Sequence, residues 1–308
     1  MEFLTVLKSI FTMMSFMAMG YILVKTGKAN PSHGKSFSTF LIYCGTPGMF
    51  IASFQEMTFS RESGKSLLLF FLVSMLMQVL MYLIMLLFLR KKLEEGKYRI
   101  LSIASFMGNV GFFGQPLIQA LFPDHPIASC YSMMIALSMN MLIFTLGEYM
   151  ISRDRKYITL KRVFINPTVL AAIVAIPMYI LNIKLPTPVY NISYILRSMN
   201  GPVCMIILGL RLATMNMKEI FSDPFNYVVS FCKLLLFPLL CLAALQFIPS
   251  IDRVFKVALI ISAGTPCASV ILALAEVHSC EEKRAACIVL MSSIFCIITL
   301  PLLTLLVR

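Results

Sequence analysis

Two apolar segments of this chain, half a chain apart, are each interrupted by glycine and proline. Residues 108–116 are Gly-Asn-Val-Gly-Phe-Phe-Gly-Gln-Pro, and residues 262–269 are Ser-Ala-Gly-Thr-Pro-Cys-Ala-Ser. Each lies in the middle of a stretch that is otherwise apolar enough to cross a membrane. Because unpaired backbone groups are costly in lipid, a helix is broken there only where protein or a watery cavity satisfies them. Matched breaks in two halves of a chain indicate a transporter's binding site.

The composition is that of a polytopic membrane protein. Of 308 residues, 59% are hydrophobic and 13% are charged, whereas a soluble domain carries about 25% charged residues. The net charge of +12 comes from basic residues in short loops between apolar runs. Such charges set membrane topology, so we expect the lipid bilayer as a partner and no nucleic acid.

The residue pattern offers no chemistry for a metal centre or an enzyme. The nine cysteines form no Cys-x-x-Cys pair, and the three histidines lie in loops without metal-ligand spacing. No serine, cysteine and histidine converge in one apolar span. We therefore expect no metal, no cofactor, no disulfide and no catalytic activity.

The predicted fold is an all-α polytopic membrane protein with ten transmembrane helices. Because a span needs about 20 mostly apolar residues, we place the spans at residues 3–24, 36–56, 66–89, 99–121, 126–149, 167–184, 188–212, 225–247, 254–276 and 284–306. The chain is expected to form a single transporter unit over residues 1–308. Lysine and arginine concentrate in alternate loops, which predicts a multi-pass protein of the cell membrane with both termini outside.

Prolines recur half a chain apart and indicate an internal repeat. The pairs are Pro31 with Pro186, Pro47 with Pro202, and Pro116 with Pro266. Residues 1–154 and 155–308 then form two five-helix repeats. An odd number of spans inverts the second repeat relative to the first, so broken helices 4 and 9 are predicted to cross at mid-membrane.

The broken spans are suited to an anion. A helix that begins at mid-membrane presents unpaired N–H groups and the positive end of its dipole. Thr265 as N-cap with Pro266 at the first helical position predicts such a start, and Gln115 with Pro116 predicts a second. Two such ends facing each other favour a carboxylate over a cation.

Small and amide side chains flank the first break. Gly108, Gly111 and Gly114 would let backbone and ligand approach closely. Asn109 carries both an amide donor and an acceptor. It is interpreted either as a ligand contact or as a cap that satisfies loose backbone.

Charged residues within spans are expected to have a structural or functional role, because a charge at the centre of a span costs about 2.5–3.5 kcal/mol on insertion scales. Lys233 lies well inside span 8, and its repeat mate is Gln78 in span 3; both are expected to support the crossing. Lys8 and Arg197 are interpreted as snorkelling toward the outer face. Glu148 is a candidate for proton coupling, with a solvated position at the span end as the favoured alternative.

The motifs resemble the auxin efflux carrier family over essentially the whole chain. They comprise residues 109–117 in span 4, Asn166-Pro167, residues 184–186, Pro202 with Gly209-Leu210, Thr265-Pro266, and residues 299–301. The resemblance implies ten spans, a scaffold domain and a transport domain that move relative to each other, and homodimers. It also implies that Asn109 contacts a substrate carboxylate.

The chain departs from the plant members of that family in two ways. It lacks their long hydrophilic central loop, and Gly108 stands where the plant motif has proline. The bacterial malate- and malonate-permease-like branch therefore suggests small carboxylates as substrates. Two alternatives remain open: a sodium-coupled carrier similar to bile-acid symporters, and a membrane sensor built on a transporter fold.

Overall fold

The computed structural model describes residues 2–154, 156, 160–248 and 251–307, and the regular structure in these ranges is helical apart from one isolated β-bridge. Within these described ranges, seven helical segments are long and apolar enough to cross a membrane. They are α1 (Glu2–Lys25), α2 (His33–Phe40) continued by η1 (Leu41–Gly45) and α3 (Thr46–Gln55), α4 (Arg61–Leu89), α7 (Pro126–Leu142) continued by η3 (Ile143–Gly147) and α8 (Glu148–Ser152), α11 (Thr187–Leu212), α13 (Pro224–Phe231) continued by η5 (Cys232–Leu236) and α14 (Phe237–Leu245), and α17 (Glu282–Thr304).

The other helices are shorter or interrupted. They are α5 (Gly96–Ala104) with η2 (Val110–Gly114) and α6 (Gln115–Leu121), α9 (Leu160–Ile165), the apolar α10 (Pro167–Ile180), α12 (Met217–Ser222), and α15 (Arg253–Ala263) with α16 (Ser269–Val277). Each of the ten predicted segments contains helix. The chain leaves the helical conformation inside the fourth and ninth of them, at residues 105–109 and 264–268.

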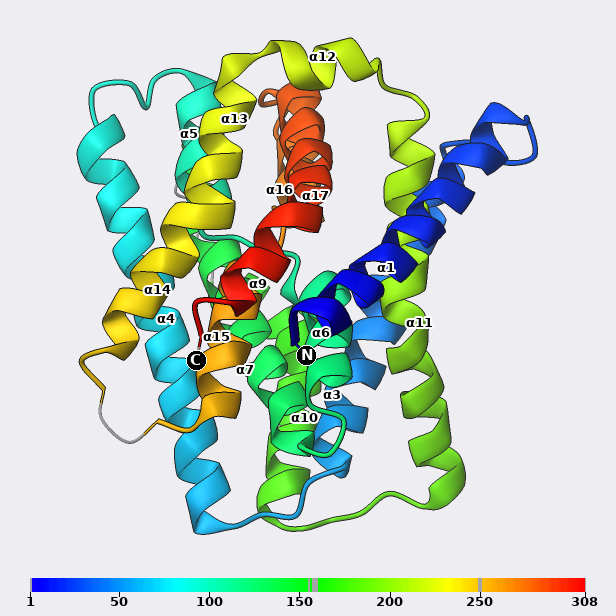
Figure 1. Ribbon diagram of the computed structural model, residues 1–308, viewed down its shortest axis with the longest axis vertical. Coiled ribbons are helices and arrows are strands. Elements are labelled where there is room, and N and C mark those ends of the chain that lie inside the picture. Colours follow the sequence, from blue (N-terminus) through cyan, green and yellow to red (C-terminus); the bar gives the residue numbers. More distant parts are fainter. Residues whose placement is uncertain (1, 155, 157–159, 249–250, 308) are drawn as a thin grey trace.

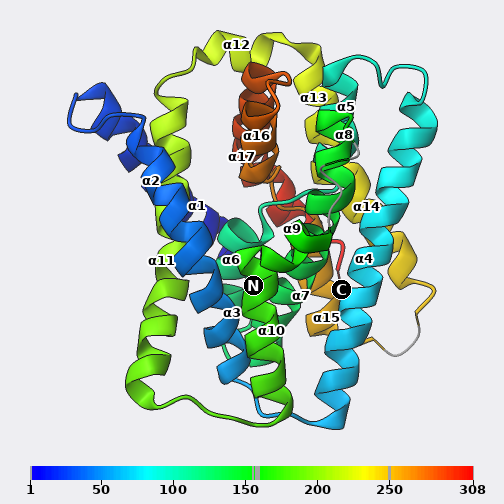
Figure 2. The same cartoon turned by 180° about the vertical axis from the view of Figure 1, so that it is seen from behind.

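The helices pack as two groups that also contact each other, α1 with α6 and α17, and α3 and α10 with α7. In the first, α11 packs against α1 and α3, and α3 packs against α10. Figures 1 and 2 show α3 between α10 and α11 from both sides. In the second group, α4 packs against α7, α15 against α7 and α14, and α17 against α13 and α16.

The connections gather at the two ends of the long axis. Figure 1 shows α12 and the connections 26–32 and 90–95 at one end, and the connections 56–60 and 181–186 at the other. The first end carries Lys28, Arg90, Lys91 and Lys92. Basic loops therefore share one end, and the side of the membrane that this end faces stays a prediction.

Prolines explain three widened turns in the helices. The five-residue π-helical segments η1, η2 and η5 lie two residues before Pro47, Pro116 and Pro238, respectively. Proline has no N–H to donate, and its ring clashes with the carbonyl of residue i−4. The backbone avoids this clash by widening locally to i→i+5 bonding, so the helix continues through each proline.

Glycines let α11 pack close to its neighbours. A Cβ atom on Gly20 would lie 2.2 Å from the Ile206 carbonyl oxygen, and one on Gly209 would lie 2.0 Å from the Met17 carbonyl oxygen. Side chains are excluded at both positions, so the backbones of α1 and α11 are nearly in contact. Interfaces of this kind, built on small residues, are typical of membrane helices.

Candidate substrate site at two paired helix breaks

The two helix breaks lie side by side near the middle of the fold. Gly108 and Cys267 form an antiparallel β-bridge. The Asn109 N–H donates to the Pro266 carbonyl oxygen at 2.8 Å, and the Ala268 N–H donates to the Met107 carbonyl oxygen at 3.1 Å. The paired breaks, residues 105–109 and 264–268, are called the crossing below. Each break satisfies part of the freed backbone of the other, as interrupted helices inside a membrane require.

Both helices restart at positions that differ from the predicted ones. The first restarts directly after Asn109, so Pro116 lies inside a continuous helix; the second restarts at Ser269, with Ala268 as N-cap. The Thr265 hydroxyl instead donates to the Ser262 carbonyl oxygen at 2.7 Å, which closes the end of α15. The second predicted start was wrong because Cys267 pairs with Gly108 and the chain turns helical only after this bridge. The first was wrong because residues 110–114 already form the π-helical segment η2, so the helix begins before Gln115.

The two helix starts expose backbone donors. The N–H groups of Gly111 and Phe112, and those of Ser269 and Val270, make no hydrogen bond to another described residue. All four residues are partly accessible. Free N–H groups at a helix start attract anions, and the helix dipole adds about 0.3–2 kcal/mol to this attraction.

Lys233 lies at the crossing. Its side chain is fully buried, and its ammonium donates a hydrogen bond to the carbonyl oxygen of Ala263, the last residue of α15. A Cβ atom on Gly108 would lie 3.0 Å from the Lys233 Nζ atom. The ammonium therefore lies between the end of α15 and the bridge, where it adds positive charge to the crossing.

Glycine is required where the two breaks touch. A Cβ atom on Gly108 would lie 2.3 Å from the Thr265 hydroxyl oxygen, and one on Gly114 would lie 2.9 Å from the Thr265 methyl group. Gly111 is less confined, since its Cβ would meet only the end of the Met49 side chain, at 3.0 Å. The close approach is thus to Thr265 of the second break, from Gly108 in the first break and from Gly114 at the end of η2.

The Asn109 side chain does not cap the helix that follows it. The residue is 4% exposed, and its amide Nδ2 donates to the Cys204 sulfur of α11 at 3.7 Å. Its backbone carbonyl accepts from the N–H groups of Phe113 and Gly114. The side chain therefore faces α11, across the boundary between the two helix groups.

The other predicted residues lie away from the bridge. Gln115 and Pro116 line a cavity between α1, α6 and α11. The Gln78 amide donates to the Ser138 hydroxyl of α7 at 2.7 Å. Glu148 is 5% exposed, with its Oε1 4.0 Å from the His278 Nε2, so the favoured alternative of a solvated Glu148 was wrong. The structure brings together Gly108, Asn109, Thr265, Pro266 and Lys233, and leaves the remaining candidates outside this cluster.

Arg197 is not a snorkelling side chain. Its side chain is 3% exposed and forms a two-pronged ion pair with Glu56, with Nη1 at 2.7 Å from Oε2 and Nη2 on Oε1. The Tyr190 hydroxyl donates to the same carboxylate at 3.0 Å. Sequence reasoning missed Glu56 because its partner lies on a distant helix, although an acidic residue at the end of an apolar span was a visible signal.

Ser292 was also missed. Its hydroxyl on α17 accepts a hydrogen bond from the Cys267 N–H at 3.0 Å, so it satisfies the central backbone donor of the second break. Two adjacent serines, Ser292 and Ser293, in an otherwise apolar span were the available signal. All nine cysteines are free thiols in the structure, and eight of them are buried.

The apolar helices and the paired breaks define a multi-pass helical membrane protein of the transporter class. The model of the family described as "Membrane transport protein" matches residues 5–162 and 152–304. The chain belongs to this family, that of the auxin efflux carriers that its motifs resemble. It is also similar to an uncharacterized transporter of Methanocaldococcus jannaschii, with 24% identity over 296 residues that cover 92% of each chain.

Proposed function

We propose that this protein is a secondary transporter that moves small carboxylates by alternating access, with the crossing as its substrate site. The observation that carries the proposal is the meeting of two helix starts and a buried lysine at one point. Free N–H groups of η2 and α16 and the Lys233 ammonium all favour negative charge there. The small carboxylates suggested by the malate- and malonate-permease-like branch fit this site.

The proposal includes ten membrane passes in two inverted repeats of five. The seven long segments, α10, and the two interrupted pairs supply the ten. The bridge is consistent with the inversion, because its two hydrogen bonds are exchanged by a local twofold axis that passes between Gly108 and Cys267. A second contact points the same way: Asn200 Nδ2 donates to the Gly45 carbonyl oxygen at 2.9 Å, and these residues precede the paired prolines Pro202 and Pro47 by two positions each.

The two helix groups are the proposed moving parts. The group of α1, α3, α10 and α11 acts as the scaffold, and the group that carries both breaks acts as the transport domain. Asn109 faces Cys204 of the scaffold, so a substrate bound at the crossing would lie at the boundary between the groups. Movement of one group past the other would then open the site to alternate sides.

The test is uptake of labelled malonate into proteoliposomes. Asn109→Ala is expected to reduce uptake at least several-fold while the purified variant keeps the thermal unfolding midpoint of the parent protein. Equal uptake by this variant and the parent would contradict the placement of the carboxylate at Asn109. A parent protein that binds carboxylates without flux would instead support the sensor hypothesis.

Sodium dependence separates the two carrier hypotheses. Replacing external sodium with potassium at constant ionic strength is expected to leave malonate uptake unchanged. Uptake that stops without sodium would favour the sodium-coupled carrier, and would leave the crossing as the candidate site.

A further inference from the structure

A polar cavity of about 310 Å³ lies between α1, α6 and α11. Its polar lining residues are Ser9, Thr12, Gln115, Gln119, Arg197 and Ser198. Cavities of about 300–1,000 Å³ with a few convergent polar groups are the usual small-molecule sites. The cavity adjoins the helix that starts at the crossing but is lined by neither Asn109 nor Thr265, so it is a separate compartment.

The Gln115 side chain is 1% exposed, and its amide nitrogen has no hydrogen-bond partner among the described residues. Leaving such a buried donor unsatisfied costs about 1–3 kcal/mol. The amide oxygen and nitrogen exchange positions by rotation of the terminal torsion, so the amide can direct N–H groups into the cavity. A ligand with acceptor oxygens would satisfy it.

Arg197 supplies further donors to the same cavity. A guanidinium has five N–H groups, and Glu56 accepts from one on each of Nη1 and Nη2. The remaining N–H groups are available to a second acceptor. Because Glu56 neutralises the guanidinium charge, an anion would bind here less tightly than at an unpaired arginine, and its binding would compete with Glu56.

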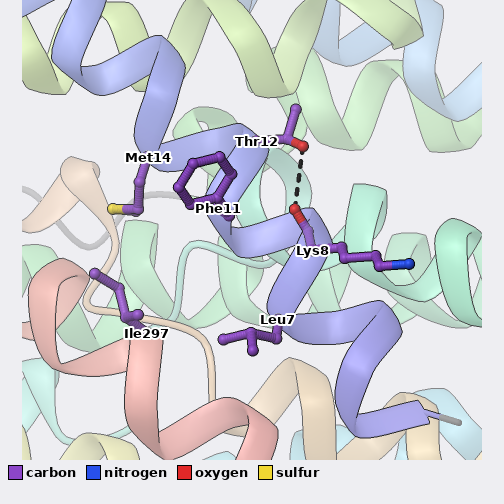
Figure 3. A pocket seen from close by; sticks show the side chains of 6 residues that line it. All are labelled: Leu7, Lys8, Phe11, Thr12, Met14 and Ile297. Atoms are coloured by element: carbon purple, nitrogen blue, oxygen red, sulfur yellow. Dashed lines mark hydrogen bonds between the residues drawn. The ribbon is translucent and has the colours of Figure 1, made fainter.

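The larger neighbouring cavity lacks these properties. It measures about 560 Å³ and lies between α1 and α17. Figure 3 shows Leu7, Phe11, Met14 and Ile297 around it, and the Lys8 side chain directed away from them. Thr12 lines both cavities, but its hydroxyl donates to the Lys8 carbonyl oxygen at 3.1 Å. The polar cavity is therefore the better place for an anion.

We infer that the polar cavity between α1, α6 and α11 is a second carboxylate site, at which Gln115 and Arg197 bind the transported anion before or after it occupies the crossing. This inference rests on the proposed function in taking the transported carboxylate as its ligand. The ligand carboxylate competes with Glu56 for Arg197. The second site therefore binds more weakly than it would without Glu56, which lets the anion leave for the crossing.

The chain contains no tryptophan, so a single introduced tryptophan reports on one site alone. Phe16→Trp places the reporter in the cavity lining, and Phe112→Trp places it at the helix start of the crossing. Each purified variant is titrated with malonate, and with chloride at the same ionic strength as the control. We expect saturable malonate responses from both reporters and none with chloride.

Second substitutions in the Phe16→Trp protein identify the groups that bind. Gln115→Leu is expected to raise the malonate concentration that gives the half-maximal response about fivefold. This factor corresponds to the loss of one hydrogen bond of about 1 kcal/mol. Glu56→Gln is expected to lower the same concentration several-fold, a gain in affinity that damage to the fold would not produce. Asn109→Ala is expected to leave the midpoint within about twofold, because one hydrogen bond at a separate site does not couple strongly to this one.

Each outcome decides between the two proposals. A response at Phe112→Trp with none at Phe16→Trp overturns the second site and leaves the crossing in place. A response at Phe16→Trp alone supports the cavity and overturns the crossing as a carboxylate site. If neither reporter responds to malonate, both the cavity and the crossing are overturned as carboxylate sites. An unchanged midpoint in Gln115→Leu, or an equal response to chloride, overturns the cavity as a carboxylate site.

Discussion

The buried ammonium of Lys233 donates a hydrogen bond to the carbonyl oxygen of Ala263, where α15 ends at the crossing. A carbonyl oxygen at a helix end has no partner within its own helix. Lys233 supplies that partner and places a positive charge next to Gly108. The proposed function gives the same side chain a second role, in binding the anion.

Lys233→Met should separate these two roles. Lys233→Met leaves the buried Ala263 carbonyl oxygen without its hydrogen-bond donor, which costs about 1–3 kcal/mol, so the thermal unfolding midpoint should fall and reports on the structural role. Malonate affinity should fall about 10- to 100-fold, since a hydrogen bond to a charged group contributes about 1.5–3 kcal/mol. Titration of the Phe112→Trp reporter measures this loss. Unchanged affinity would show that the ammonium serves the helix end alone.

Gly108→Ala should disrupt the crossing, because the added methyl group would lie 2.3 Å from the Thr265 hydroxyl oxygen and 3.0 Å from the Lys233 Nζ atom. We expect malonate uptake to be lost. Gly111→Ala is the matched control, since its methyl group meets only the flexible end of Met49. It should keep most of the uptake. Equal uptake by the two variants would contradict the required contact of the two breaks.

Gly209→Ala should separate α1 from α11. Its methyl group would lie 2.0 Å from a backbone carbonyl oxygen that cannot move aside easily, and overpacking of this kind costs about 1–3 kcal/mol. The thermal unfolding midpoint should fall clearly. In Gly34→Ala the nearest atom would lie 3.7 Å away, in ordinary contact, so this variant should unfold like the parent protein.

Glu148→Gln tests proton coupling. Glu148 lies 4.0 Å from His278 in a buried position, where loss of the carboxylate charge removes a site that can gain and lose a proton. Uptake by the parent protein should rise when the outer solution is made acidic, and uptake by the variant should not. Exchange of internal for external malonate at equal pH should be the same in both. If malonate uptake by the parent protein does not change with the pH gradient, Glu148 has no role in proton coupling.

Local sequence patterns predicted the helices and the two breaks well. Long apolar runs located the helical segments to within a few residues, because hydropathy and length decide which segments suit the bilayer. The glycines and prolines near residues 108–116 and 262–269 located the breaks, because these residues weaken helices wherever they stand.

Contacts between distant residues decided what the sequence could not. The helix after the second break starts at Ser269 rather than Pro266 because residues of the first break pair with the intervening backbone. The buried Arg197 side chain pairs with Glu56, which directly follows α3 and is 141 residues away in the sequence, and the proximity of His278 to Glu148 is likewise non-local. A single amino-acid sequence carries no direct signal for contacts between residues that are far apart along the chain.

The two-bond bridge between Gly108 and Cys267 has a mechanical consequence. It joins the two interrupted helices at their breaks, so neither helix can tilt or slide relative to the other without losing both hydrogen bonds. In the proposed alternating-access cycle, the two interrupted helices would therefore move as one unit. A displacement of either interrupted helix is therefore transmitted to the other through the bridge.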